Sequence, residues 1–238
     1  MLVYPLPLVG LIYLPKFFMI WYRYSRLERK GVRVNWRDKH PCLHDSSLNT
    51  PFDPHYFYQG AWLARRVAQI KPQKHTDIGS SVQTIGVLSA TVKTEFIDFR
   101  PLKVNLPSLI SKAGNILNLE YKNNTIESLS CLHVMEHIGL GRYGDPLDPD
   151  GSKKAAAELQ RVLKPGGYLY LSLPVGRERI CFNAHRVHDP MTVLNMFNQL
   201  DLIEFSLVDD DGKYTESVSV ECGKKLNYGC GLFVFQKS

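Results

Sequence analysis

The sequence predicts an α/β fold built on a doubly wound, mostly parallel sheet. Three observations support this. First, strand-like apolar runs alternate with helical stretches from about residue 52 onward. Second, glycine-containing turns separate these runs and stretches. Third, only a polar stretch lies between the last two strand-like runs. Such alternation is typical of parallel sheets with right-handed crossovers. A chain of 238 residues, 44% of them apolar, can bury the core that this sheet needs.

Each expected element has a local signal. Residues 55–70 have helical length and period, and Asp53 precedes them as an N-cap. The helix expected at 152–163 stops at residues 164–167, whose Pro-Gly-Gly sequence favours a turn. The other expected elements are a helix at 82–92, a strand at 75–81 that ends in a turn, and strands at 94–99, 114–119, 126–134, 168–175, 202–208 and 230–236. The last two strands are expected to form an antiparallel ribbon.

The positive charge lies almost entirely at the start of the sequence. Residues 1–40 hold eight Lys or Arg and only two acidic residues, so they account for the whole formal net charge of +6. The neutral remainder argues against a protein-wide nucleic-acid-binding surface. The sequence therefore predicts an apolar and basic segment at residues 1–40 and a globular domain at residues 41–238.

Residues 1–22 form the most apolar stretch of the chain, and a basic run follows them. Their length would suit a membrane-spanning helix, but several residues disfavour a straight one. These residues are Pro5, Pro7, Gly10, Pro15 and Lys16. A signal peptide is disfavoured because no basic region precedes the apolar run. We expect a kinked, re-entrant or interfacial anchor beside anionic lipid on the cytoplasmic side. The alternative is an apolar arm packed on the domain or on a partner subunit.

The cysteines are scattered and odd in number. They are Cys42, Cys131, Cys181, Cys222 and Cys230. No Cys-x-x-Cys occurs, so neither a zinc ribbon nor a redox motif is predicted. Free and mostly buried thiols in a reducing compartment are expected.

Three turns contain candidate ligand-binding residues, because ligands of doubly wound sheets bind beyond the carboxyl ends of the strands. Asp77 and Gly79 end the first strand, and Gly79 permits close approach of a ligand to the backbone. Asp98 ends the second strand, where a carboxylate can accept hydrogen bonds from ribose hydroxyls. Asn115 begins the third expected strand, and its amide can bind the edge of a base. The order of these residues favours a ligand that contains a nucleoside.

Four stretches resemble the successive motifs of one family. They are HTDIGSS at 75–81, EFIDFRPL at 95–102, GNILNLEYKNNTIESLSCLHVMEHI at 114–138 and ELQRVLKPGGYLYLSLPV at 158–175. Residues 55–237 thereby resemble the class I S-adenosyl-L-methionine-dependent methyltransferases. TPFDPHYFYQGAW, CLHVMEHIGLGRYGDPLDPDG and CFNAHRVHDP look closer still to a methyltransferase-like family of unknown function, whose members tend to be associated with surface-polysaccharide biosynthesis.

The resemblance implies a Rossmann-like, mostly parallel seven-stranded sheet and S-adenosylmethionine as the cofactor. The cofactor-binding residues that it implies are Asp77, Gly79, Ser80, Asp98, Asn115, Ile116 and His133. Asp77 and Gly79 would line the methionine and ribose end of the cofactor. Asp98 would bind the ribose hydroxyls, and Asn115 and Ile116 would contact adenine.

Histidines are expected to accept the proton when a methyl group is transferred to an oxygen, because the histidine pKa lies near neutrality. The catalytic candidates are His133, His137, His185 and His188. The acceptor-binding candidates are Glu136, Arg142 and Arg186. Residues 139–151 are expected to form a lid or, alternatively, a solvated loop that places Asp150 near the N-terminus of the following helix. A purely structural role for Glu136 and His137, in which they cap a short helix and bond backbone groups, is the alternative.

An inverted zinc-protease motif, H-x-x-E-H, is also spelled by residues 133–137. Its chemistry needs both histidines on one helix, and His133 ends an expected strand. A metal-dependent hydrolase is therefore disfavoured, and no metal is expected.

The predicted function is O-methylation of a sugar, glycolipid or polysaccharide intermediate by a peripheral or monotopic protein on the cytoplasmic face of a membrane. The expected partners are this acceptor and an anionic membrane surface, without nucleic acid. The alternative is a non-catalytic binding or scaffold protein of the same fold in a membrane-associated complex. Ser81 stands where a second glycine is usual and favours the alternative, whereas Asp77, Gly79 and Asp98 oppose it.

Overall fold

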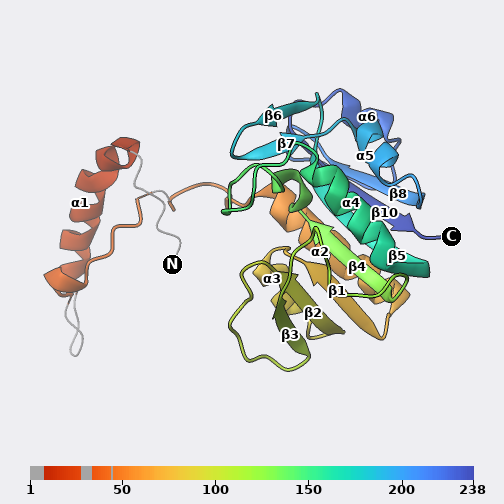
Figure 1. Ribbon diagram of the computed structural model, residues 1–238. Helices are drawn as coiled ribbons and strands as arrows, with labels where there is room; N and C mark the ends of the chain where they lie inside the picture. Colours follow the sequence, from red (N-terminus) through yellow and green to blue (C-terminus); the bar gives the residue numbers. More distant parts are fainter. Residues whose placement is uncertain (1–7, 28–33, 44) are drawn as a thin grey trace. The chain divides into compact units, whose positions relative to one another are not determined.

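The computed structural model describes residues 8–27, 34–43 and 45–238 (Figure 1). The chain divides into two compact units, Met1–Phe52 and Asp53–Ser238. The boundary expected after residue 40 falls within the first unit. The breaks expected at Pro5 and Pro7 lie outside the described residues, and so does the part of the basic run at residues 28–33.

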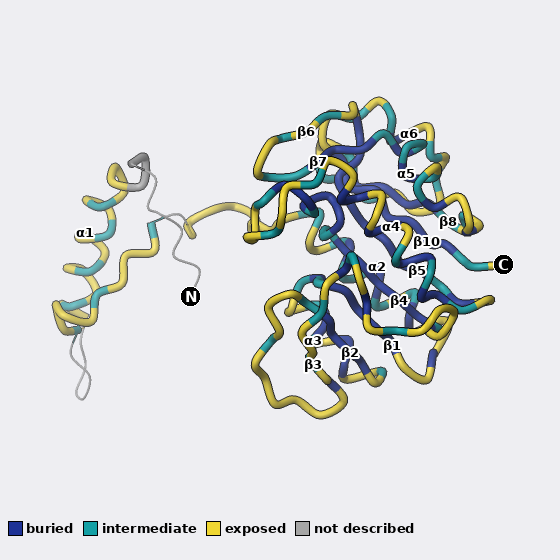
Figure 2. The backbone as a smooth tube through the Cα atoms, in the orientation of Figure 1, coloured by how far each residue is buried: buried dark blue, intermediate teal, exposed yellow. Residues whose placement is uncertain are grey.

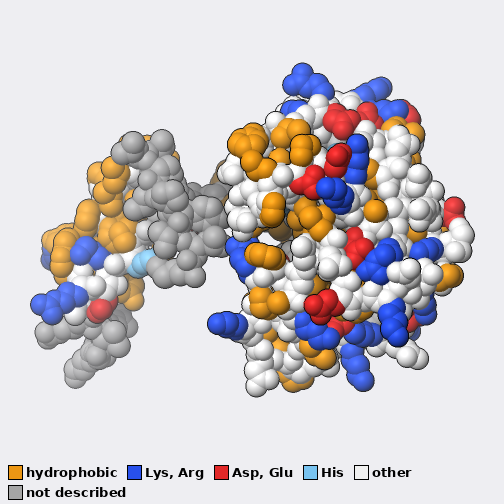
Figure 3. Space-filling view, in the orientation of Figure 1, with side chains coloured by type: hydrophobic (Ala, Val, Ile, Leu, Met, Phe, Trp, Pro, Cys, Tyr) orange, Lys and Arg blue, Asp and Glu red, His pale blue; other side chains and the backbone are white. Residues whose placement is uncertain are grey.

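The described part of the first unit contains the helix α1 (Leu14–Ser25), with 3-10 turns before and after it, η1 (Leu8–Tyr13) and η2 (Trp36–Asp38). Pro15 lies in the first turn of α1, where a proline is tolerated, so it begins the helix and does not kink it. No residue of α1 is buried, and hydrophobic side chains cover much of its visible surface (Figure 3). No helix among the described residues is long and apolar enough to cross a membrane.

An eight-stranded sheet, in which every residue is described, forms the centre of the second unit. Its strand order is β3-β2-β1-β4-β5-β10-β8-β9. The strands are β1 (Lys74–Ile78), β2 (Lys93–Asp98), β3 (Leu109–Ala113), β4 (Ile126–Leu132), β5 (Leu163–Val175), β8 (Asp201–Val208), β9 (Tyr214–Thr215) and β10 (Gly229–Gln236). β1 to β5 pair in parallel, and β10 pairs antiparallel with β5 and β8. The expected parallel sheet with a C-terminal antiparallel ribbon is confirmed. The eighth strand is β9, a two-residue addition at the edge.

The remaining elements cover the sheet or connect its strands. They are α2 (Pro54–Ile70), α3 (Val82–Leu88), η3 (Met135–His137), α4 (Gly151–Val162), α5 (Pro190–Met196), α6 (Glu221–Lys224) and the ribbon of β6 (Arg179–Cys181) with β7 (His185–Val187). Asp53 caps α2 as expected, because its Oδ1 accepts a hydrogen bond from Tyr56 N at 3.2 Å.

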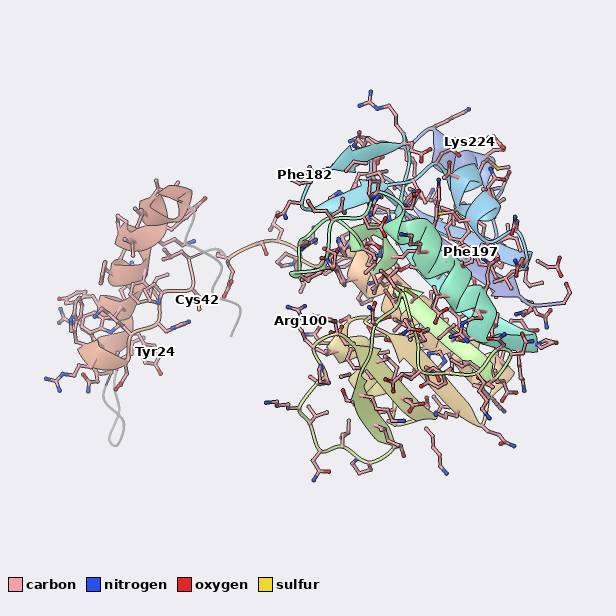
Figure 4. All side chains as sticks on the ribbon, viewed as in Figure 1. Tyr24, Cys42, Arg100, Phe182, Phe197 and Lys224 are labelled. Atoms are coloured by element: carbon pink, nitrogen blue, oxygen red, sulfur yellow. The ribbon has the colours of Figure 1, made fainter. Side chains whose placement is uncertain are left out.

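Two hydrophobic clusters lie on opposite faces of the sheet, whose central strands are buried along most of their length (Figure 2). α2 and α3 cover one cluster, in which Trp62 of α2 is buried. α4 and α5 cover the other, which contains Phe197, labelled in Figure 4. Residues along β5 alternate between the two, since Leu169 faces the second cluster and Tyr170 the first. Burial on both faces explains why the central strands are apolar along most of their length.

The prediction of the third strand at 114–119 is wrong. β3 ends at Ala113, and the backbone then turns: Gly114 N donates to Asp98 O at 3.0 Å, and Asn115 Oδ1 accepts from Leu117 N at 2.9 Å. β3 is an edge strand with mostly exposed side chains, so its register with β2, and not an apolar pattern, defines it. The helix before residues 164–167 ends at Val162, as expected. These residues do not form a separate turn but lie in the irregular start of β5, where the register with β4 shifts and Gly166 has a φ of 74°.

All five cysteines are free, as expected. The prediction that most of them are buried is wrong. Only Cys131 and Cys230 are buried, because they alone lie on central strands of the sheet.

Candidate active site

A cleft of about 220 Å³ opens where β1, β2 and β4 end, near the point at which the strand order reverses. Side chains and backbone from four turns line it, among them Gly79, Asp98, Ile116 and Val134. The fold therefore brings the turns singled out in the sequence to one place, although 55 residues separate Gly79 from Val134. Doubly wound sheets bind ligands at this position.

Gly79 allows a ligand to approach the end of β1. Its φ is 65°, a left-handed conformation that glycine adopts without strain. A Cβ at this position would lie 3.3 Å from Asp98 Oδ2 and 3.3 Å from both methyl carbons of Val134. A side chain here would thus occupy the space between two walls of the cleft.

Asp77 does not line the cleft, contrary to the expectation that it contacts the cofactor. It is fully buried, and its carboxylate accepts hydrogen bonds from Ser80 N at 3.0 Å, from Ser80 Oγ at 2.6 Å and from Ser130 Oγ. Ser80 Oγ also accepts from Leu132 N at 3.0 Å. Both side chains therefore hold the β1–α3 turn against β4. Burial raises the pKa of Asp77 to about 6.

Asp98 and Ile116 line the cleft, as the resemblance implies. Asp98 Oδ1 accepts from Arg100 N at 2.7 Å, which fixes the carboxylate at the end of β2. Ile116 offers an apolar surface and is only 7% exposed. Asn115 also lies at the cleft, but its Oδ1 is engaged by Leu117 N in the turn, which leaves its NH₂ group for a ligand.

A second cavity, of about 560 Å³, adjoins the cleft. It is lined by His55, Tyr56, His133, Glu136, His137, Arg142, His185, Tyr228, the segment at residues 209–212, and Asp53 with Pro54. His133 and His137 line the cleft as well as this cavity, so the two spaces meet at these side chains.

His133 follows β4 in a left-handed conformation, with φ 55°. Its Nδ1 lies 3.1 Å from Ser172 Oγ, and Ser172 donates its hydroxyl hydrogen to Gln59 Oε1 at 2.6 Å. With Gln59 Oε1 facing Ser172, the Ser172 oxygen accepts from Nδ1–H, which leaves a lone pair on Nε2. That Nε2 is buried and has no hydrogen-bond partner in the part of the chain that the structure describes. Burial lowers the pKa of His133 to about 3.

His137 belongs to the one-turn helix η3. Its Nδ1 lies 2.6 Å from Ala184 O, a carbonyl that can only accept, so Nδ1 carries the hydrogen and Nε2 a lone pair. Burial lowers the pKa of His137 to about 4, and the ring is neutral at physiological pH. His133 lies outside η3, so the helix that an inverted zinc-protease site needs is not formed.

Glu136 is fully buried although it lines the cavity, and neither carboxylate oxygen has a hydrogen-bond partner among the described residues. Burial raises its pKa to about 8, so at neutral pH it is a neutral acid. Its Oε1 lies 3.7 Å from His137 Nε2. It makes no side-chain cap of η3, which opposes the purely structural alternative for this residue.

Arg186 and His188, like Asp77 and Ser80, line neither the cleft nor the cavity. Arg186 is 5% exposed, and its guanidinium donates to Ile138 O at 2.6 Å and to Asp148 O at 3.2 Å. It holds the loop after η3, so the expectation that it binds the acceptor is wrong. Arg142 and His185 do line the cavity, and Arg142 Nη1 donates to Ala184 O at 3.0 Å.

The loop expected to form a lid lies at the cleft. Tyr143, Asp145, Pro146 and Asp148 line it. Asp148 N donates to Gly139 O at 2.9 Å, and Gly139 N to Asp145 Oδ2 at 2.6 Å, so the loop is closed on itself. Arg100, labelled in Figure 4, places its guanidinium carbon 4.7 Å from the ring centroid of Tyr143, which joins the loop to the end of β2.

Sequence reasoning missed three groups of residues in the second cavity: His55, Tyr228 and the acidic segment at residues 209–211. His55 lies on the first turn of α2, and the others lie in loops beside β10 and β8. No local motif marks them, because the pairing of β8 with β10 places residues 209–211 beside Tyr228, and the packing of α2 adds His55.

Comparisons with known proteins agree with this geometry. A model of the family described as "Caenorhabditis protein of unknown function, DUF268" matches residues 80–228. The solved N-methyltransferase NodS from Bradyrhizobium japonicum WM9, in complex with S-adenosyl-L-homocysteine, is 16% identical, with a TM-score of 0.54 and coverage of 91% of this chain and 98% of NodS. The cyclase SpnF is 12% identical, with a TM-score of 0.56 and coverage of 76% and 80%.

A shorter match links the chain to "Probable methyltransferase ltbC" from Aspergillus luteorubrus. The two are 40% identical over 63 residues, which are 26% of this chain and 19% of that protein. The chain thus matches about a fifth of the relative's length. Together the structures show that the second unit has the class I methyltransferase fold. This fold carries a methyltransferase in one neighbour and a cyclase in the other, so the reaction must be argued from the site.

Proposed function

This chain belongs to the family described as "Caenorhabditis protein of unknown function, DUF268". From that premise and from the geometry of its two cavities, we propose that it is an S-adenosylmethionine-dependent methyltransferase. We infer that it methylates an oxygen of a sugar or glycolipid intermediate of polysaccharide synthesis. The observation that carries this proposal is the junction of the cleft and the cavity at His133 and His137. A methyl donor in one space and an acceptor in the other would meet at these side chains.

The cleft suits a nucleoside that carries a sulfonium group. Asp98 offers a carboxylate for ribose hydroxyls, Ile116 an apolar surface for adenine, and Gly79 a backbone without a side chain. Bound S-adenosylmethionine supplies an activated methyl group on a cationic sulfur. Asp77 and Ser80 support this arrangement from behind, because they fix the turn that carries Gly79.

The second cavity suits a neutral acceptor rich in hydroxyl groups. Asp53, Asp209, Asp210 and Asp211 line it, whereas Arg142 is the one lysine or arginine among the described residues of its wall. Carboxylates accept hydrogen bonds from hydroxyls and repel anions, so a phosphate or carboxylate acceptor is disfavoured. The rings of Tyr56 and Tyr228 can pack against a sugar face. This lining supports the sugar class of acceptor that the sequence resemblance suggests.

His137 is the proposed proton acceptor. Its neutral ring has Nδ1–H bound to Ala184 O, so Nε2 is free to take a proton at the junction of the two spaces. As the acceptor oxygen bonds to the methyl carbon, the hydroxyl proton passes to Nε2, and the electron pair of the broken carbon–sulfur bond stays on sulfur. His137 holds this position because η3 follows directly on β4.

We also propose that residues 1–40 bind an anionic membrane surface on the cytoplasmic side. α1 exposes Phe18, Met19, Ile20 and Tyr22, and no residue of this helix is buried. Lys16, Arg23 and Arg26 lie on or next to it. Apolar surface together with cations is the pattern of interfacial helices.

Transfer of a labelled methyl group tests the proposed reaction. Purified full-length chain would be incubated with labelled S-adenosylmethionine and candidate neutral glycan precursors, followed by identification of the methylated atom. We expect an O-methyl product with neutral sugars or glycolipids. If the chain binds the cofactor but transfers no methyl group to any class of glycan, the result would instead support a non-catalytic protein, or an enzyme with a different reaction, on the same fold.

A further inference from the structure

Three metal-ligating side chains from distant parts of the sequence converge at the inner wall of the second cavity. His55 lies on the first turn of α2, His133 follows β4, and Cys230 lies on β10. One ligand atom of each lies within 4.8 Å of the other two. From this convergence we propose that His55, His133 and Cys230 bind a zinc ion, whose fourth coordination position faces the cavity.

The His133 ring is already oriented as a ligand. Its Nδ1–H is held by Ser172, which is held in turn by Gln59, so Nε2 presents a lone pair. Nε2 is buried and has no partner among the described residues, an arrangement that costs free energy in a protein interior unless a ligand satisfies it. Metal-bound histidines are usually fixed in this way through the other ring nitrogen.

Cys230 supplies a sulfur in the same enclosed place. The residue is fully buried, and its Sγ has only a distant contact, 4.0 Å from Gly231 O. Zinc binds the thiolate, so coordination would release the thiol proton to solvent. The other buried cysteine, Cys131, lies on the neighbouring strand β4 and is not part of the cluster.

His55 completes the site from the cavity side. Its ring centroid lies 5.6 Å from that of His133 and 5.3 Å from that of Tyr228. Zinc–nitrogen bonds of about 2.0–2.1 Å and zinc–sulfur bonds of about 2.3 Å in a tetrahedral site require the ligand atoms to draw together by up to about 1.4 Å. Rotation of the partly exposed His55 ring on the first turn of α2 can supply this movement.

The ligand set favours zinc over the hard cations. One thiolate and two imidazoles suit zinc, whereas magnesium and calcium prefer oxygen ligands. Three protein ligands with an open fourth position are the pattern of catalytic zinc sites. The ion would bind an acceptor hydroxyl there and lower the pKa of that hydroxyl. This role rests on the proposed function, whereas metal binding itself does not.

Metal titration of the full-length chain tests the inference. After treatment with a chelator, calorimetry with Zn²⁺ should show one equivalent bound. Co²⁺ should give a thiolate-to-cobalt charge-transfer band in its absorption spectrum. Cys230→Ser should abolish this band, and His55→Ala should weaken zinc binding more than about tenfold. Cys131→Ser, which changes the other buried cysteine, should keep both signals.

Absence of zinc binding by the wild-type chain would overturn the inference, and so would an unchanged cobalt spectrum in Cys230→Ser. Circular dichroism checks that Cys230→Ser folds; if it does not, the partly exposed His55 gives the decisive variant. Affinity for S-adenosylhomocysteine is measured on the same samples. Cofactor binding without zinc contradicts this inference alone, and zinc binding without cofactor contradicts the proposed function alone.

Discussion

Burial determines what single side chains at the site can do. Asp77 and Glu136 are both fully buried carboxyl groups. Asp77 has three hydrogen-bond donors around it, whereas Glu136 has none among the described residues. The pKa of Glu136 is consequently raised further, to about 8 against about 6 for Asp77. Asp77 therefore stabilises a turn, whereas Glu136 keeps a neutral acid beside His137.

Glu136 gives the protein a pH-dependent stability. Its pKa is raised from 4.5 in the unfolded chain to about 8 in the fold, so the folded state keeps a proton that the unfolded state loses. The contribution of this group to the stability of the wild type should therefore fall by a few kcal/mol as pH rises from about 4.5 to about 8. Glu136→Gln lacks this loss. Urea unfolding of both proteins in the presence of a chelator should show that the free energy of unfolding of Glu136→Gln increases relative to that of the wild type as pH rises. A constant difference between them across this range would contradict the assigned pKa.

His137 as the proton acceptor predicts a selective loss of turnover. His137→Gln should lower kcat by about 10²- to 10⁴-fold, the usual contribution of a general base, and leave the affinity for S-adenosylhomocysteine nearly unchanged. His40→Gln, in the first unit, is the control and should change neither quantity. An equal loss in affinity and kcat would show that His137 acts by holding the cofactor.

At the scale of elements, the turn between β1 and α3 sets the shape of the cleft. Gly79→Ala would place a methyl group 3.3 Å from Asp98 Oδ2 and from the Val134 methyl carbons, at a φ of 65°. We expect weaker binding of S-adenosylhomocysteine and a lower Tm. Gly86→Ala in α3 is a matched control, because its Cβ would meet nothing within 4 Å. It should leave binding intact and stabilise the helix by about 1 kcal/mol or less. Equal effects of the two changes on cofactor affinity would contradict the role of Gly79.

Sequence patterns predicted elements well where local signals and burial agree. The Asp53 cap, the apolar central strands and the C-terminal ribbon are such cases. The edge strand β3 was misplaced because its exposed side chains carry no apolar pattern. Asp77 and Arg186 have the residue types of ligand-binding groups, yet they serve the fold, because hydrogen bonds to Ser80 and to backbone carbonyls engage them internally. Tertiary packing also creates the cluster of His55, His133 and Cys230, which no local sequence motif predicts.

At the scale of the whole molecule, the net positive charge and the candidate chemistry belong to different units. The first unit holds α1 with its exposed apolar side chains, and the second holds both cavities. The charge of +6 in residues 1–40 therefore lies outside the unit that holds the candidate chemistry.

Membrane binding through the first unit predicts a change of cell fraction. Deletion of residues 1–30 should move the protein from the membrane fraction to the soluble fraction, since it removes the exposed apolar helix and most of the basic run. Purified full-length chain should sediment with vesicles that contain anionic lipid, and less with neutral vesicles, in a salt-dependent way. Unchanged fractionation after the deletion would favour an arm packed on protein.

Calorimetric titration of the full-length chain with S-adenosylmethionine and S-adenosylhomocysteine tests whether the cleft binds this cofactor. Both should bind with one-to-one stoichiometry. Asp98→Ala should weaken binding by about 10- to 100-fold, the loss expected for hydrogen bonds to a charged group. Asp201→Ala, at an exposed position on β8, should not. Absence of binding at millimolar ligand would contradict the account, and wild-type affinity in Asp98→Ala would contradict the placement of the cofactor.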